Sequence, residues 1–144
     1  MFIVEHPKSL GKTLSLLWMF AILNVLFRDV HELTTASAAN EILTGYVNGN
    51  VVTEEVLFYA AFGVELFLLG SLLSQLLRPI FARWYNLVSV PSVLAGMLMS
   101  PPTDLDDYFF ATVVICTLIA IFVIALRWDT KNMLDQIQEH DRVS

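Results

Sequence analysis

Apolar residues gather along the chain into four blocks of about twenty residues, the length that a helix needs to cross a bilayer. The blocks cover residues 10–30, 56–77, 80–99 and 108–126, and short polar segments separate them. Their length and continuity differ from the short alternating runs of β-strands. The pattern therefore predicts an all-α, polytopic membrane protein with four transmembrane helices in an up-down bundle. Residues 1–128 form this domain, and residues 129–144 form a polar tail.

Composition supports this class. Hydrophobic residues make up 56% of the chain and charged residues only 15%, which excludes an ordinary soluble domain. The net charge of −6 does not indicate nucleic-acid binding, because the eight Lys and Arg residues are divided among the predicted helix ends. We expect no nucleic-acid partner. The one cysteine, Cys116, lies in an apolar block and excludes a disulfide framework or a cysteine-based zinc site.

Charge also predicts the orientation. In a four-span arrangement every Lys and Arg except Arg28 falls on one side, and the acidic connections fall on the other. The basic set is Lys8, Lys12, Arg78, Arg83, Arg127, Lys131 and Arg142, and the acidic set is Glu41, Glu54, Glu55, Asp104, Asp106 and Asp107. Since Lys and Arg favour the cytoplasmic side, we expect both termini in the cytoplasm and the protein in the plasma membrane.

The longest connection, residues 34–53, contains no Lys or Arg. Ser37 to Thr44 is compatible with one or two helical turns that end at Gly45, and Asn48-Gly49-Asn50 is a turn signal. Two interpretations stay open, a solvated loop and a lid over the mouth of the bundle.

The second block carries a single carboxylate, Glu65, near its middle. Placing a carboxylate at membrane depth costs free energy, so such a group usually pairs with another residue, lines a cavity or takes part in proton transfer. The first helix runs outward and the second returns, which places Asn24 and Glu65 at comparable depths. Arg28, one turn beyond Asn24, can extend outward or reach toward Glu65.

These depths suggest a polar intramembrane pocket open to the acidic outer face. Its proposed lining is Asn24, Arg28, Tyr59, Glu65, Asn86 and Ser89. Each member also has a structural interpretation. Glu65 can be an interhelical hydrogen-bonding group, the asparagines and serines can join helices, and Arg28 can pair locally with Asp29.

Small residues predict where helices approach closely. Gly63, Gly70 and Ser74 recur at helical spacing in the second block, and Gly96 occupies a similar strip in the third. Trp18 is expected to pack within the bundle. Metal binding by His31 and Glu32 with the acidic loop at 104–107 is a weak possibility, and a solvated negative rim is favoured. We expect no metal and no cofactor.

A set of short motifs resembles a known family. It comprises Leu17-Trp18-Met19-Phe20, Asn24, Leu26, Asp29, Leu33, Glu65, Trp84 and Asn86, between Lys12 and Trp128. The chain is similar to an uncharacterised family of small prokaryotic four-helix integral membrane proteins. The resemblance implies the architecture and draws attention to Asn24, Asp29 and Glu65. It implies no activity.

No catalytic constellation is present at membrane depth, so we expect no enzyme. The first functional hypothesis is proton-linked binding or transport of a small cation or amphiphile at Glu65, within a homo-oligomer. The second is a non-catalytic accessory or assembly subunit of a larger membrane complex. The third is an enzyme acting on a lipid or quinone. The bilayer and another membrane-protein surface, its own or a partner's, are the expected partners.

Overall fold

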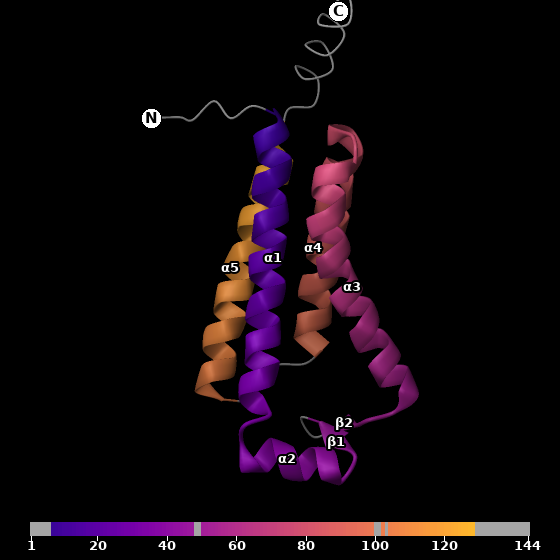
Figure 1. The fold of residues 1–144 in the computed structure, drawn as a ribbon, viewed down its shortest axis with the longest axis vertical. Coiled ribbons are helices and arrows are strands. Elements are labelled where there is room, and N and C mark those ends of the chain that lie inside the picture. Colours follow the sequence, from indigo (N-terminus) through magenta and orange to yellow (C-terminus); the bar gives the residue numbers. More distant parts are fainter. Residues whose placement is uncertain (1–6, 48–49, 100–101, 103, 129–144) are drawn as a thin grey trace, which may run out of the picture.

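The computed structural model describes residues 7–47, 50–99, 102 and 104–128. These residues form five helices and one short hairpin (Figure 1). In chain order they are α1 (Pro7–Glu32), α2 (Ala36–Leu43), β1 (Tyr46–Val47), β2 (Asn50–Val51), α3 (Glu54–Leu76), α4 (Pro79–Met99) and α5 (Leu105–Arg127). The all-helical class is confirmed. The described residues contain five helices, because α2 forms in the connection between the first two apolar blocks. The turn residues Asn48 and Gly49 and the tail at 129–144 lie outside the described residues.

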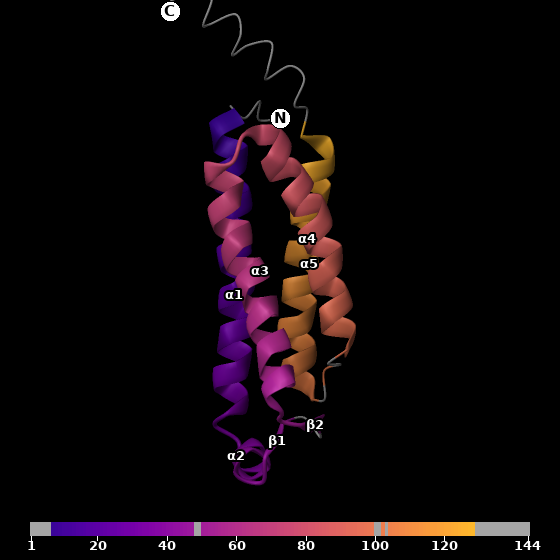
Figure 2. The same ribbon diagram turned by 90° about the vertical axis from the view of Figure 1, so that its right-hand side faces the viewer.

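The four long helices α1, α3, α4 and α5 stand side by side and alternate in direction (Figures 1 and 2). Helix α1 packs against α3 and α5, and α4 packs against the same two helices. Thus α1 and α4 stand diagonally across the bundle. The start of α1, the α3–α4 turn and the end of α5 lie at one end, which we call the turn end. Helix α2 and the hairpin lie at the opposite end, the hairpin end.

Side-chain caps determine where several helices begin. The Thr53 hydroxyl accepts a hydrogen bond from the Val56 amide over 3.3 Å, so α3 begins at Glu54, slightly before the apolar block. The Asp104 carboxylate accepts from the Asp107 amide over 3.2 Å in the same way and starts α5. Acidic residues follow both caps, where the helix dipole favours negative charge.

The connection between α1 and α3 folds into α2 and a hairpin. Thr35 caps α2, which ends just before Gly45, and Gly45 has a φ of 80°. Glycine adopts this left-handed conformation without the steric cost of a Cβ atom. The predicted helical turns ending at Gly45 are therefore confirmed. Tyr46 pairs with Val51 across the antiparallel hairpin.

Three helices are long and apolar enough to cross a membrane, judged by length and composition: Leu10–Glu32, Glu54–Leu76 and Leu105–Arg127. Helix α4 has 21 residues but is not among them. Its first half carries Arg83, Asn86 and Ser89, which lower its hydropathy. The molecule has the features of a membrane protein with three candidate spans.

The core lies where the four long helices meet. Its fully buried residues include Leu14, Trp18, Val90, Val114, Leu118 and Ile121. The Trp18 ring meets Phe67 edge to face, with ring centroids 5.6 Å apart. A Cβ atom on Gly70 would lie 2.5 Å from the Trp18 ring, so only glycine fits there.

Helix α3 is covered far less than its neighbours. Its buried residues are Phe67, Gly70 and Ser74, all in its second half. Residues 54–66 contribute none, and this half leans away from α1 and α5 in Figure 1. Only 11% of the apolar window of α3 is buried, against 28% for α1 and 33% for α5. Most of the surface of α3 therefore has no packing partner among the described residues.

Candidate functional site

Glu65 lies at the middle of α3 on its exposed face. Phe67 and Gly70, which pack against Trp18, occupy the other side of the helix. No hydrogen bond or ion pair reaches the Glu65 carboxylate from any residue that the structure describes. The carboxylate is thus directed out of the bundle.

Arg28 has other partners than Glu65. Its Nη2 and Nε atoms lie 2.8 and 3.1 Å from Asp29 Oδ1, and Nε lies 3.9 Å from Asp107 Oδ1. The possible reach of Arg28 to Glu65 is not observed, because α3 diverges from α1 at this depth. Asn24 donates to the Phe20 carbonyl of its own helix over 2.8 Å.

The remaining members of the predicted pocket are also dispersed. Tyr59 is 72% exposed on the outward-leaning half of α3, whereas Asn86 and Ser89 are buried between helices. The structure therefore does not gather the six residues into one pocket. Residue spacing predicts the position of each side chain along its helix, but it predicts neither the lean of α3 nor the rotation that directs Glu65 outward.

Asn86 belongs to a buried polar network that joins three helices. Its Oδ1 accepts from Trp18 Nε1 over 2.6 Å, and its Nδ2 donates to Ser74 Oγ over 3.1 Å and to the Ala82 carbonyl over 2.7 Å. Both amide hydrogens and the carbonyl oxygen are thus used. This network holds α1, α3 and α4 in register and leaves the Asn86 amide without a free donor for a ligand.

The helix-packing residues divide into two groups. Gly70 and Ser74 lie in the α1–α3 contact. At Gly63 and Gly96 a Cβ atom would meet nothing within 4 Å, so these two do not permit a close approach between described helices. Gly11 is not among the predicted helix-packing residues, although a Cβ atom there would lie 2.6 Å from the Ser74 carbonyl oxygen.

The close contact at Gly11 can be recognised from the spacing of residues in the sequence. Gly11, Ser15 and Trp18 are spaced by four and three and share one face of α1. In the antiparallel α1–α3 pair, Gly11 faces Ser74, the Ser15 hydroxyl lies 3.0 Å from that of Ser71, and Trp18 faces Gly70. Small residues on both helices thus match in register.

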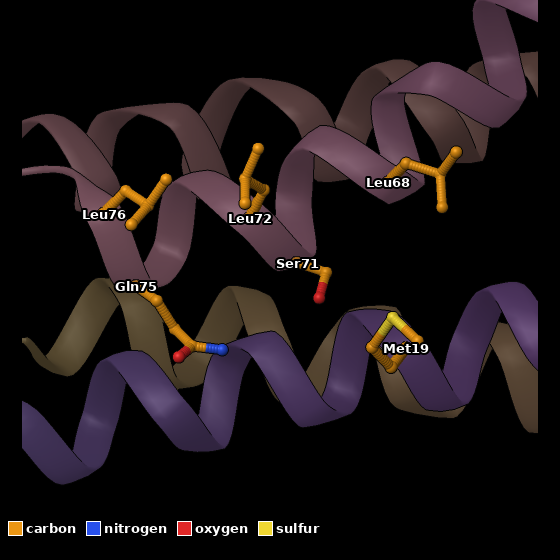
Figure 3. Close-up of a pocket in the computed structure, with 6 residues that line it drawn as sticks. All are labelled: Met19, Leu68, Ser71, Leu72, Gln75 and Leu76. Atoms are coloured by element: carbon orange, nitrogen blue, oxygen red, sulfur yellow. The ribbon is translucent and has the colours of Figure 1, made fainter.

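A shallow groove of about 290 Å³ lies outside this contact (Figure 3). Its lining consists of Met19 from α1 and Leu68, Ser71, Leu72, Gln75 and Leu76 from α3. Ser71 and Gln75 point toward α1, where Gln75 Nε2 donates to Ser15 Oγ over 2.6 Å. The polar groups of the groove are engaged with α1, and leucines form most of its outer wall.

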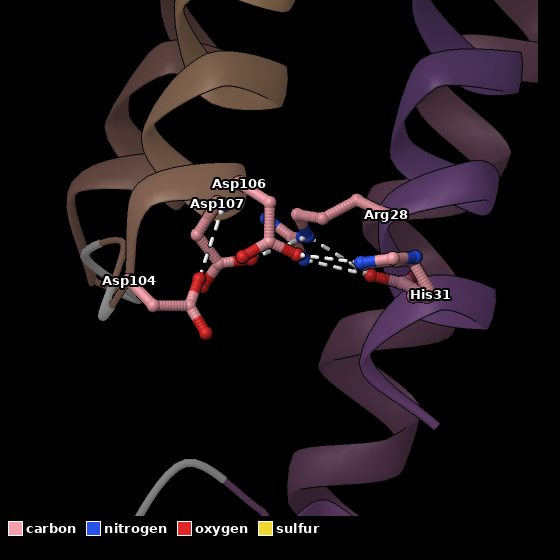
Figure 4. A network of polar contacts seen from close by, with 6 residues as sticks. Arg28, His31, Asp104, Asp106 and Asp107 are labelled. Atoms are coloured by element: carbon pink, nitrogen blue, oxygen red, sulfur yellow. Dashed lines mark hydrogen bonds and ion pairs between the residues drawn. The ribbon is translucent and has the colours of Figure 1, made fainter. Parts of the chain in front are cut away.

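A charged cluster ties the hairpin ends of α1 and α5 together (Figure 4). His31 Nε2 lies 3.2 Å from Asp106 Oδ2, beside the Arg28–Asp107 contact. Asp107 is 5% exposed, whereas both members of the His31–Asp106 pair are largely exposed. Across the described residues, no group of three or more His, Cys, Asp or Glu is arranged to hold a metal ion.

A family of unknown function, DUF6326, matches residues 1–135. The chain belongs to this family. The expected membership of a family without an assigned activity is confirmed. No curated protein and no solved structure matches the chain. The DUF6326 match spans every described helix. It identifies no ligand or reaction, so the geometry of the described residues is the basis for a proposed function.

Proposed function

We propose that the protein is a four-span integral membrane protein of a prokaryotic plasma membrane, with both termini in the cytoplasm. Helix α4 would be the fourth span, because it runs beside α3 and α5 over a similar length. Arg78, Arg83 and Arg127 lie at the turn end, whereas acidic residues begin α3 and α5 at the hairpin end. The positive-inside rule then favours a cytoplasmic turn end.

Single cysteines test this orientation in a Cys116→Ser background. Thr44→Cys at the hairpin end should react with a membrane-impermeant maleimide in intact cells. Leu77→Cys at the turn end should react only after the membrane is permeabilised. The reverse pattern would overturn the orientation, and labelling of both sites in intact cells would overturn the four-span topology.

Within the membrane we propose a non-catalytic assembly role, in which the exposed face of α3 binds another membrane-protein surface. One observation carries this proposal: the first half of α3 has no buried residue, and no described residue pairs with Glu65 in the middle of the helix. An ionised carboxylate facing lipid tails costs about 2.5–3.5 kcal/mol on insertion scales. A neighbouring helix that offers polar groups would remove much of that cost.

Mild-detergent solubilisation followed by native electrophoresis tests the assembly role. The wild-type protein should migrate as a complex, and Phe62→Ala combined with Glu65→Leu should shift it to the monomer. Phe81→Ala combined with Trp84→Ala is the matched control, since these α4 side chains are 60% and 63% exposed, close to the 60% of Phe62. A monomeric wild type, or equal loss in the control, would contradict the proposal.

The second candidate is proton-linked binding of a small cation or amphiphile at Glu65. The observation that favours it is the carboxylate itself, which no described residue neutralises. In proteoliposomes, Glu65→Gln should abolish pH-dependent uptake or binding while leaving the protein folded. Unchanged pH dependence in that variant would remove this candidate.

A further inference from the structure

We propose that the surface covering α3 is the α3 helix of a second copy of this chain, an inference that rests on the assembly role above. The contact would follow one stripe, which we call the α3 seam. Its members, spaced alternately by four and three residues, are Phe58, Phe62, Glu65, Leu69, Leu72 and Leu76. This spacing averages 3.5 residues, the repeat by which one helix packs along another over several turns.

Within the described residues, no member of the α3 seam is buried. The five apolar members are 38% (Leu69) to 70% (Leu76) exposed, and Glu65 is exposed as well. The residues of α3 that contact α1 lie on a different side of the helix and include Phe67, Gly70, Ser71 and Gln75. The helix therefore carries two packing faces, one satisfied within the bundle and one open.

Membrane insertion makes the α3 seam self-complementary. Two copies with the same orientation are related by a two-fold axis along the membrane normal, and such an axis places each residue of one α3 at the depth of its own counterpart. Glu65 of one copy therefore faces Glu65 of the other. A single polar residue within an apolar seam fixes the register, because any shift would bury that group against leucine or phenylalanine.

The chemistry of the carboxyl group permits this pairing. Two adjacent carboxylates cannot both be ionised at low dielectric, but one retained proton allows the protonated oxygen to donate to the other carboxylate. Arg28, the cation that was considered as a partner for Glu65, is already paired with Asp29 and Asp107. In a two-fold dimer, the partner of Glu65 is therefore Glu65 of the second copy.

The groove beside the α3 seam gives the second helix a matching surface. Leu72 and Leu76 belong both to the seam and to the wall of the groove, next to Met19 of α1. Apolar side chains from the second α3 would pack into this open groove. A dimer would then bury apolar surface on both sides of Glu65.

Single-cysteine crosslinking in native membranes tests the pairing, again in a Cys116→Ser background. Phe62→Cys and Leu69→Cys on the seam should form disulfide-linked dimers on mild oxidation, since each meets its own copy. Leu57→Cys and Val64→Cys are controls, because they are 57% and 43% exposed on a different face of α3. The expected result is efficient crosslinking at the seam positions and little at the controls.

Three outcomes would overturn the pairing. Equal crosslinking at seam and control positions would indicate random collision. Absence of crosslinks together with a monomeric mass by native mass spectrometry would contradict both the dimer and the assembly role. A seam-specific adduct to a different protein, without a self-adduct, would overturn the second copy as the occupant and leave the assembly role standing.

Variants of Glu65 in the Phe62→Cys background test the carboxyl pair itself. Glu65→Gln should retain the dimer because amides also pair, whereas Glu65→Leu should weaken it by about threefold to thirtyfold, the range of interhelical polar contacts in membranes. Glu65→Lys should lose self-pairing but crosslink with co-expressed chains that keep Glu65. Unchanged self-crosslinking of Glu65→Lys would contradict the proposed pair.

Discussion

Trp18 donates its indole N–H to Asn86 Oδ1 over 2.6 Å and thereby joins α1 to α4, two helices that stand diagonally across the bundle. Ser74 of α3 completes the junction by accepting from the Asn86 amide. A single buried amide thus connects three helices. Its position explains why α3 and α4 remain packed at the turn end while the other half of α3 leans outward.

The Trp18–Asn86 hydrogen bond should contribute measurably to stability. Trp18→Phe keeps a ring beside Gly70 but removes the N–H, which leaves Asn86 Oδ1 only a 3.5 Å contact with Ser74. The expected loss is about 1–3 kcal/mol in the free energy of unfolding. SDS-induced unfolding in mixed micelles measures it. Trp84→Phe, at a 63% exposed site, should change little, and equal losses would contradict the assignment.

The three glycines that were expected to mediate helix packing should respond differently to alanine. Gly70→Ala places a Cβ atom 2.5 Å from the Trp18 ring and should destabilise by about 1–3 kcal/mol through overpacking. Gly63→Ala and Gly96→Ala meet open space and should be neutral or stabilising by up to about 1 kcal/mol, since alanine favours helix. Thermal denaturation in detergent separates the two results. A destabilising Gly63→Ala would show that another surface packs there.

Among the described residues, the two ion pairs that join α1 to α5 at the hairpin end should differ in strength. Arg28→Ala removes a cation from beside the buried Asp107 and should cost about 1–3 kcal/mol, less than a fully buried pair because Arg28 is 25% exposed. His31→Ala breaks a pair whose members are 59% and 42% exposed, and should cost less than about 1 kcal/mol. Double-mutant cycles with Asp107→Asn and Asp106→Asn measure each coupling. A larger coupling for His31 would reverse this ranking.

Arg83 should hold the last turn of α5 in place. Its Nε and Nη2 atoms donate to the Ala125 and Leu126 carbonyls over 3.1 and 3.3 Å. Arg83→Ala should speed amide hydrogen exchange over residues 124–128 by about tenfold, which corresponds to ~1.4 kcal/mol. Arg127→Ala, an exposed site on the same turn, is the control. Equal acceleration by both variants would indicate a charge effect without specific hydrogen bonds.

Much of the fold can be predicted from the sequence, because the positions of the helices follow from local patterns of residues. The apolar blocks locate the long helices, and the helical turns predicted before Gly45 form α2. The packing of Gly70 and Ser74 also follows from spacing, since small residues four apart form a strip on any helix. On α1, Gly11, Ser15 and Trp18 are spaced so that they also share one face of the helix.

The candidate site was predicted less well. Depth along the helix correctly places Glu65 at the middle of α3, but depth says nothing about rotation around the helix axis. The sequence therefore assigned Glu65 and Asn86 to one pocket, whereas the structure directs the first outward and buries the second.

By itself the sequence determined which segments are helical and where along each helix the polar residues lie. Only the tertiary structure decided which face of each helix is covered. Trp18 occupies the space beside Gly70, and Asn86 completes its hydrogen bonds with Trp18 and Ser74. These long-range contacts set the rotation of α3 about its axis. That rotation leaves Glu65 on the open face, because a helix packed along one face must expose the other.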